Sequence, residues 1–153
     1  MVSWPVLFDT NILIDYLSSR REARAELERH SNRAISIVTW MEVMAGVTPA
    51  DEEQTRAFLL DFSLLPLTAE VADRAVAIRR DRKLKLPDAI ILATAEVAGR
   101  VLVTRNTRDF PKGTPGVRVP YSLKAFCKRR DAGFLCQAPD RPKQRFGLAR
   151  RAD

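Results

Sequence analysis

The sequence has one histidine, two cysteines and no glycine-rich loop, and these scarcities exclude several kinds of active site. A ribonuclease that uses two histidines for acid–base catalysis cannot be built with His30 alone, and most zinc hydrolase sites need more than one histidine. His30 lies in a highly charged segment, so we expect it on the surface. No glycine-rich motif is present to hold a nucleotide phosphate. Catalysis by this chain would have to rest on other side chains.

The cysteines argue against a zinc site, and the apolar segments argue against a membrane span. Cys127 and Cys136 lie near the end of the chain without a neighbouring histidine or further cysteine, so we expect free thiols rather than a zinc site. The best apolar run, residues 89–98, is interrupted by Glu96 and is too short to cross a bilayer. The amino terminus has no basic region followed by an apolar stretch. We therefore expect a cytoplasmic protein that does not contact a membrane.

Positive charge is abundant but unevenly distributed. The net charge is +7 over 153 residues. Residues 1–123 hold 17 Lys and Arg against 16 Asp and Glu, whereas residues 124–153 hold nine against three. The length and this division predict one domain over residues 1–123, followed by a basic tail over residues 124–153. The tail has no sustained hydrophobic period, and we expect it to be disordered.

Short apolar runs alternate with helical patterns through residues 1–123. This alternation is typical of an α/β protein whose parallel sheet is covered by helices on both faces. Within the helical segments, Arg24 and Glu28 have the spacing of a side-chain ion pair, and Pro66 places the segment around it at a sheet edge or in a connection. The predicted strands are residues 6–8, 34–38, 64–67, 101–104 and 117–119; the predicted helices are residues 11–17, 20–30, 39–46, 49–62, 68–82 and 87–98.

Four acidic residues lie just after predicted strands or in the first turn of predicted helices. They are Asp9, Glu42, Asp88 and Asp109. In an open parallel sheet, such positions meet in the crevice beyond the carboxyl ends of the strands. We therefore expect the four carboxylates to converge on one site.

Each acid also has a simpler local explanation. Asp9 could cap the following helix, and Thr39 and Glu42 have the spacing of a capping box. Asp88 could interact with the helix dipole, and Asp109 could close an Asx turn. These readings remain open for each residue taken singly.

Bringing four carboxylates together without a cation would cost electrostatic free energy. Two carboxylates about 4 Å apart repel by roughly 4 kcal/mol at an effective dielectric constant near 20. Hard oxygen ligands favour Mg²⁺ or Mn²⁺. Such a metal can activate water and stabilise a phosphoryl transition state. The acidic set therefore points to metal-dependent hydrolysis of a phosphodiester.

Four segments of the chain form a recognisable set: residues 9–11, 40–46, 86–95 and 103–110. Together they resemble the PIN-domain ribonucleases, and most of all the VapC toxins of bacterial toxin–antitoxin pairs. The similarity covers about residues 5–123, with the segments in the family's order and spacing. It implies a PIN-like α/β/α sandwich and a Mg²⁺- or Mn²⁺-dependent RNA endonuclease. It also implies a homodimer and an antitoxin protein that blocks the active site.

The resemblance also implies roles for particular residues. The four acids match the family's acidic set, and all four are candidate metal ligands, with Asp9 and Asp88 ranked first. Thr104 and Asn106 match polar positions that support the site. The tail from Lys124 departs from the family pattern. Two alternatives to a ribonuclease toxin remain: a PIN-like module that binds nucleic acid or protein without cutting, and a structure-specific DNA nuclease. The presence of all four acids favours the ribonuclease over the binding module, and the small size, without an added helical clamp, argues against the DNA nuclease.

Overall fold

The computed structural model describes residues 4–123. The tail that we predicted to be disordered and both cysteines lie outside the described residues. Within residues 4–123, five strands form one sheet in the order β3-β2-β1-β4-β5, and every neighbouring pair is parallel. The strands are β1 (Val6–Phe8), β2 (Arg33–Ser36), β3 (Ser63–Leu65), β4 (Val101–Val103) and β5 (Val117–Arg118). The helices are α1 (Thr10–Leu17), α2 (Arg21–Glu28), α3 (Ile37–Ala45), α4 (Glu52–Leu59), α5 (Ala69–Arg82) and α6 (Leu86–Val97).

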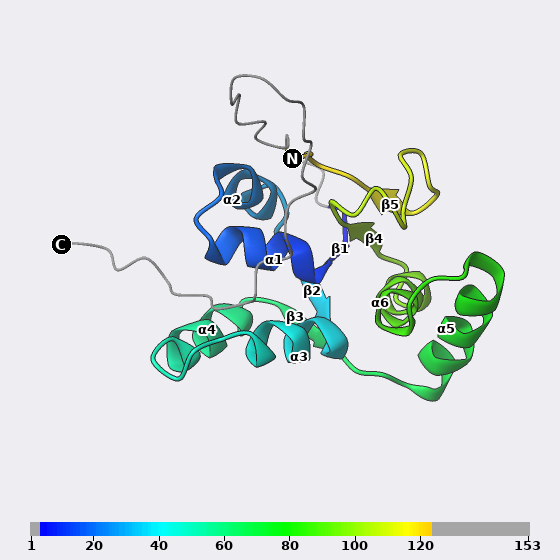
Figure 1. Cartoon of the computed structure of the whole chain (residues 1–153), viewed down its shortest axis with the longest axis horizontal. Helices are drawn as coiled ribbons and strands as arrows, with labels where there is room; N and C mark the ends of the chain where they lie inside the picture. Colours follow the sequence, from blue (N-terminus) through cyan, green and yellow to red (C-terminus); the bar gives the residue numbers. More distant parts are fainter. Residues whose placement is uncertain (1–3, 124–153) are drawn as a thin grey trace, which may run out of the picture.

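Helices cover both faces of the sheet, as the sequence predicted. Figure 1 shows α1 and α2 on one side of the strands, and α5 and α6 on the other. The strand side chains alternate between the two faces. In β1, Val6 and Phe8 pack in the core under α1, α2 and α4, whereas Leu7 packs in the core under α5 and α6. Because β1 is buried on both faces, its sequence contains no polar residue.

Two local predictions are confirmed at the periphery. The side chains of Arg24 and Glu28 form an ion pair with an N–O distance of 2.9 Å. β3, which precedes Pro66, is an edge strand of the sheet. No helix in the described part of the chain is long and apolar enough to cross a lipid bilayer.

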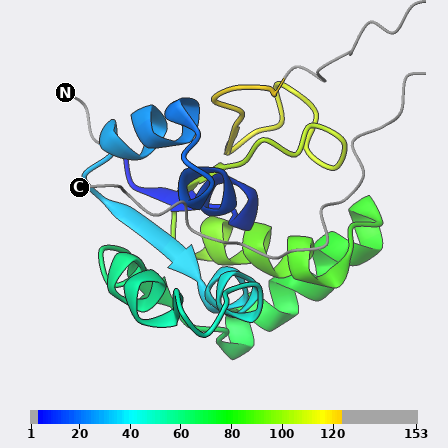
Figure 2. The same ribbon diagram turned by 60° about the vertical axis from the view of Figure 1, so that its left-hand side comes forward.

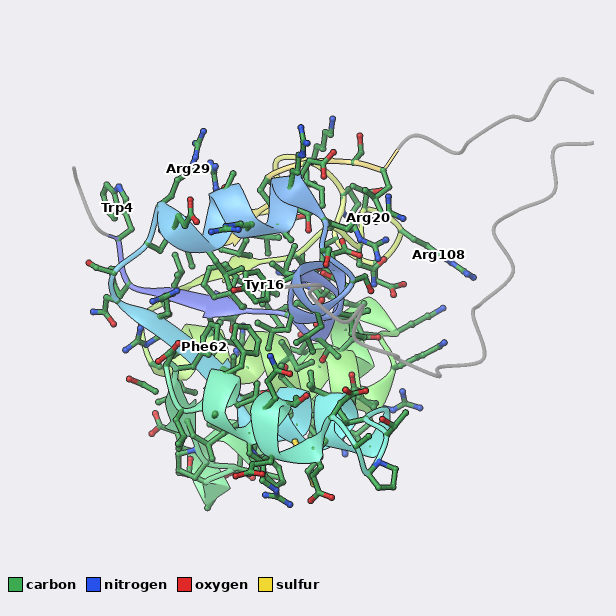
Figure 3. The ribbon with its side chains drawn as sticks, turned by 90° about the vertical axis from the view of Figure 1, so that its left-hand side faces the viewer. Trp4, Tyr16, Arg20, Arg29, Phe62 and Arg108 are labelled. Carbon is green, nitrogen blue, oxygen red and sulfur yellow. The ribbon has the colours of Figure 1, made fainter. Side chains whose placement is uncertain are left out.

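The prediction that His30 lies on the surface is wrong. Its side chain is only 10% exposed, and its Nε2 lies 3.1 Å from a carboxylate oxygen of Glu26. The His30 ring packs edge-on against Phe8, with the ring centres 5.9 Å apart. Phe62 packs against the same Phe8 ring, and Figure 3 shows Tyr16 and Phe62 on this side of the sheet. The charged neighbours in the sequence point outward, whereas His30 and Glu26 lie one helical turn apart on the inner side.

The start of α3 also differs from the prediction. We expected strand through residue 38 and a helix from Thr39, because Ile37 and Val38 are β-branched. The helix instead begins at Ile37, since the hydroxyl of Ser36 accepts a hydrogen bond from the backbone N–H of Thr39 at 3.0 Å. Ser36 is therefore the N-cap. The capping box that we considered for Glu42 does not exist, because Thr39 lies inside the helix.

The start of α4 was predicted too early. The helix begins at Glu52 rather than at Pro49, and it ends at Leu59. The residues before it form a turn in which the hydroxyl of Thr48 donates to Asp51 at 2.8 Å. That hydrogen bond stabilises the turn, and the helix begins directly after it, at Glu52.

Candidate active site

Asp9 lies where β1 ends and α1 begins. Its backbone is extended, and its carboxylate accepts a hydrogen bond from the N–H of Thr10 at 2.7 Å, so it caps α1. The residue is nevertheless almost fully buried, with 5% of its surface exposed. An N-cap is usually exposed at a helix end, so capping alone does not explain this degree of burial.

The second carboxylate oxygen of Asp9 accepts hydrogen bonds from two further side chains. The hydroxyl of Thr104 donates to it at 2.7 Å, and the side-chain amide of Asn11 donates to it at 3.0 Å. Asn11 also donates to the Thr104 oxygen at 3.0 Å, which closes a small network. The register explains the contact, because Phe8 of β1 pairs with Val103 of β4. The residues that follow the two strands therefore lie side by side.

Hydroxyl groups connect this network to α3. The Thr10 hydroxyl lies 3.3 Å from that of Thr39, which in turn lies 3.2 Å from the Ser36 hydroxyl. Glu42 lies on α3 one turn beyond Thr39, and it is exposed. With the capping box excluded, no backbone role accounts for a carboxylate at this position.

Asp88 lies in the first turn of α6 and is half-buried. No side chain caps this helix, so Asp88 makes no hydrogen bond that fixes the helix start. The favourable interaction of a carboxylate with the helix dipole still applies to it. Other acidic side chains also lie near Asp88, and an interaction with the helix dipole does not explain their presence.

Asp109 lies in the loop after β4 and is held by Asn106. The Asn106 side-chain amide donates to the Asp109 carboxylate at 2.8 Å, and the Asn106 oxygen accepts from the Asp109 N–H at 3.3 Å. The backbone N–H of Asn106 donates to the hydroxyl of Thr104 at 3.1 Å. It is therefore Asn106, and not Asp109, that accepts from the backbone in this turn. Thr104 and Asn106 both lie where they support the acids.

Burial and neighbouring carboxylates raise the pKa values of Asp9 and Asp88. Burial raises the pKa of Asp9 from 3.8 to about 6, against hydrogen bonds from Thr104 and Thr10 that lower it, while the charges of Asp88 and Glu42 raise it further. Burial also raises the pKa of Asp88, as do the charges of Asp109 and Glu42. Raised carboxylate pKa values at a crevice are typical of functional sites. The charges of Asp88 and Glu42 act on Asp9, and those of Asp109 and Glu42 act on Asp88, so the four predicted acids lie in one neighbourhood.

The donor set fits a hard divalent cation. All four candidates offer carboxylate oxygens, which Mg²⁺ and Mn²⁺ prefer, and Asp9 is already oriented by fixed donors. Within residues 4–123, however, no three acidic, histidine or cysteine side chains are arranged as a ready-made metal site. A cation bound among the carboxylates would remove their mutual repulsion.

A comparison with known sequence families shows which family has this combination of fold and acids. The profile of the PIN domain matches residues 6–113. The chain belongs to the PIN-domain family. The resemblance seen in the sequence is thereby confirmed, and the matched range of the PIN domain includes Asp9, Glu42, Asp88 and Asp109.

Several relatives of this PIN domain carry the name VapC. Ribonuclease VapC10 from Mycobacterium tuberculosis is 31% identical over 114 residues, which cover 69% of this chain and 86% of VapC10. Ribonuclease VapC1 from Methanocaldococcus jannaschii is 29% identical over 70% of this chain and 79% of its own length. A solved toxin–antitoxin complex from Klebsiella pneumoniae contains a chain that is 51% identical, with a TM-score of 0.72. That match covers 77% of this chain and 99% of the other.

Our sequence reasoning did not assign roles to two features of this PIN domain. Asn11 belongs to the motif that we compared with the family, but its bridge between Asp9 and Thr104 required the strand order to be known. Behind the site, Arg105 forms a bidentate ion pair with buried Asp15, with N–O distances of 2.6 and 3.1 Å. The hydroxyl of Tyr121 donates to the same carboxylate at 2.9 Å. Arg105 is thus committed to the scaffold, and no local sequence pattern predicts that pairing.

Proposed function

We propose that this protein is a Mg²⁺- or Mn²⁺-dependent endoribonuclease that acts as the toxin of a toxin–antitoxin pair. The observation that carries the proposal is the gathering of four acids from four separate segments at one edge of the sheet. The charges of the other acids contribute to the raised pKa values of Asp9 and Asp88, which supports their proximity. The names of the ribonucleases VapC10 and VapC1 support RNA as the substrate class.

Each residue of the site has a distinct role in this proposal. Asp9 and Asp88 are the first choices as metal ligands, and Glu42 and Asp109 complete the acidic set. A bound divalent cation supplies Lewis-acid activation of water and neutralises charge that develops on the phosphate. The hydrogen bonds from Thr104 and Asn11 hold the Asp9 carboxylate in one orientation, which lowers the cost of organising it for binding.

The test is the nearly isosteric substitution Asp88→Asn in the full chain. It removes a charge that holds the metal and leaves the size of the side chain unchanged, so cleavage of total RNA should be abolished while the melting temperature is retained. Asp73→Asn on the exposed surface of α5 is a matched control that should cut at the wild-type rate. Cleavage by Asp88→Asn at the wild-type rate would show that the site assignment is wrong. Binding of RNA by the wild type without metal-dependent cleavage would favour the non-catalytic alternative.

We also propose an antitoxin protein and a second copy of this chain as partners. The similarity to a chain of the Klebsiella pneumoniae toxin–antitoxin complex supports the first. If the reading frame directly upstream of the gene encodes the antitoxin, its co-expression should relieve growth arrest, and its product should co-purify with this chain. Light scattering should give about twice the chain mass of 17.3 kDa for the purified protein. A mass of one chain would exclude the homodimer.

A further inference from the structure

The last turn of α5 and the loop that leads to α6 form a strongly basic surface, which we call the basic corner and define as residues 79–85. Figures 1 and 2 show α5 and α6 lying side by side, joined by this loop. The corner carries five Lys and Arg against one Asp. The rest of residues 1–123 holds twelve Lys and Arg against fifteen Asp and Glu. The domain outside the corner is therefore negative overall.

None of the five cations of the corner forms an ion pair within the described residues. Six of the other twelve do, among them Arg56 with Glu52 and Arg74 with Glu96. In the corner, Arg79 donates a hydrogen bond to the backbone oxygen of Leu84 at 2.6 Å, which holds the loop against the helix. The positive charge of the corner is thus left for a partner outside the described chain.

Three of these cations line a hollow on one face of α5. Arg79, Arg80 and Lys83, together with Val76, surround a volume of about 410 Å³. Their spacing of three, four and seven residues after Val76 places them on one helical stripe. Lys83 ends the helix in a left-handed conformation, with φ of 55°. The hollow is open, and its three cationic side chains offer positive charge to a chain of phosphates.

The basic corner leads directly to the acidic site. Lys85 precedes α6 and lies three residues before Asp88 in the sequence. Asp88 lies in the first turn of that helix, so the corner runs directly into the segment that carries one of the four acids. A polyanion bound along the corner would therefore lie close to Asp88.

We propose that the basic corner binds the phosphate backbone of the RNA substrate and guides the strand to the acidic site. The identity of the strand rests on the proposed ribonuclease function. A site made of carboxylates repels a phosphodiester, so binding energy must come from cations placed beside it. Arg80, Lys83 and Lys85 supply those cations on the path to Asp88. Backbone contacts of this kind carry no sequence information, so the corner contributes affinity rather than choice of cleavage site.

The experiment separates RNA binding from cleavage. All variants carry Asp88→Asn in the full chain, so that a fluorescent single-stranded RNA of mixed sequence stays intact during an anisotropy titration at several salt concentrations. The test variant adds Arg80→Gln and Lys83→Gln. The control adds Arg24→Gln and Arg29→Gln, which remove the same charge from α2 and its C-cap. Figure 3 shows Arg29 at the end of the molecule where Trp4 lies, away from Arg108 of the loop after β4.

The test variant should bind RNA roughly 10- to 25-fold more weakly than its parent at about 0.1 M salt. Its slope of log affinity against log salt should be shallower by about 1.4, because each lost contact with a single strand removes about 0.7. The control should keep the parental slope. Equal losses in both variants, or no loss in either, would overturn the proposal, as would weaker binding that accompanies a lower melting temperature in the test variant. Cleavage of total RNA by the chain without Asp88→Asn tests the proposed function separately.

Discussion

Raising the pH of the metal-free protein should destabilise it, because Asp9 must then ionise inside the fold. Burial is the main reason that the pKa of Asp9 rises from 3.8 to about 6. The folded protein therefore keeps a proton that the unfolded chain has already released. The contribution of Asp9 to stability is complete below about pH 3.8 and is lost as the pH rises through about 6.

The size of this effect follows from the shift. About two pKa units correspond to about 3 kcal/mol of unfolding free energy. Other groups titrate over the same range, so the effect of Asp9 is isolated by comparing the wild type with Asp9→Asn. The new amide nitrogen would face the Thr104 hydroxyl and the Asn11 amide, which now donate to Asp9. Loss of those hydrogen bonds costs about 1–2 kcal/mol at any pH.

The two contributions predict a crossover. Asp9→Asn should be less stable than the wild type near pH 4.5 by up to about 1 kcal/mol, and more stable near pH 7.5 by about 1–2 kcal/mol. Urea unfolding in EDTA across this range measures the difference directly. Asp73→Asn, with its exposed side chain, should show no such crossover. Millimolar Mn²⁺ should stabilise the wild type at the higher pH by mass action and leave Asp9→Asn unchanged.

A difference between the wild type and Asp9→Asn that stays constant from about pH 4.5 to 7.5 would refute the reasoning. It would mean that the Asp9 carboxylate is solvated as well in the folded protein as in the unfolded chain. Failure of Mn²⁺ to stabilise the wild type would remove Asp9 from the set of metal ligands.

Three further predictions concern chemistry and scaffold. Cleavage should leave a 5′-phosphate and a 3′-hydroxyl, since water attacks phosphorus without the ribose 2′-hydroxyl; mass spectrometry of the products would expose a 2′,3′-cyclic phosphate if this is wrong. Thr104→Val should move the low-pH limb of the plot of cleavage rate against pH to higher pH, because Asp9 loses a hydrogen bond that lowers its pKa. Arg118→Gln should cost about 2 kcal/mol in urea unfolding, since it removes the bidentate partner of buried Glu26. Arg56→Gln, which breaks an exposed pair, should cost well under 1 kcal/mol.

The alternation of strands and helices was predictable because it depends on local periodicity. The apolar run of β1 and the carboxylate that follows it are enough to place Asp9 at the carboxyl edge of a parallel sheet. The same rule placed the other three acids near that edge. The confirmed α/β fold and PIN-domain membership therefore follow from features that lie within short segments.

The start of α3 and the environment of His30 could not be obtained in this way. Ile37 and Val38 have the β-branched side chains of a strand, and only the Ser36 hydroxyl decides that a helix begins there. His30 lies among charged residues in the sequence, but it packs against Phe8 of a strand that precedes it by more than twenty residues. In both places a specific contact outweighs the average preference of the segment.

The hydrogen-bond donors around Asp9 could be predicted only if the order of the strands in the sheet was known. Periodicity shows that residues 6–8 and 101–103 are strands, but it does not show that they are neighbours. Once β1 pairs with β4 in the observed register, Thr104 must lie beside Asp9. The network among Asp9, Asn11 and Thr104 is therefore a property of the assembled sheet.

The contact between Asp9 and Thr104 also determines when a working site can exist during protein synthesis. The two residues are 95 positions apart, and β1 lies between β2 and β4 in the sheet. A nascent chain emerges from its amino terminus, so Asp9 leaves the ribosome long before its hydroxyl donor is made. Until β4 arrives, the central strand lacks one neighbour and the carboxylate lacks its strongest support. The supported form of Asp9 can therefore exist only after β4 has emerged from the ribosome, and a chain interrupted before Val101 lacks the Thr104 donor altogether.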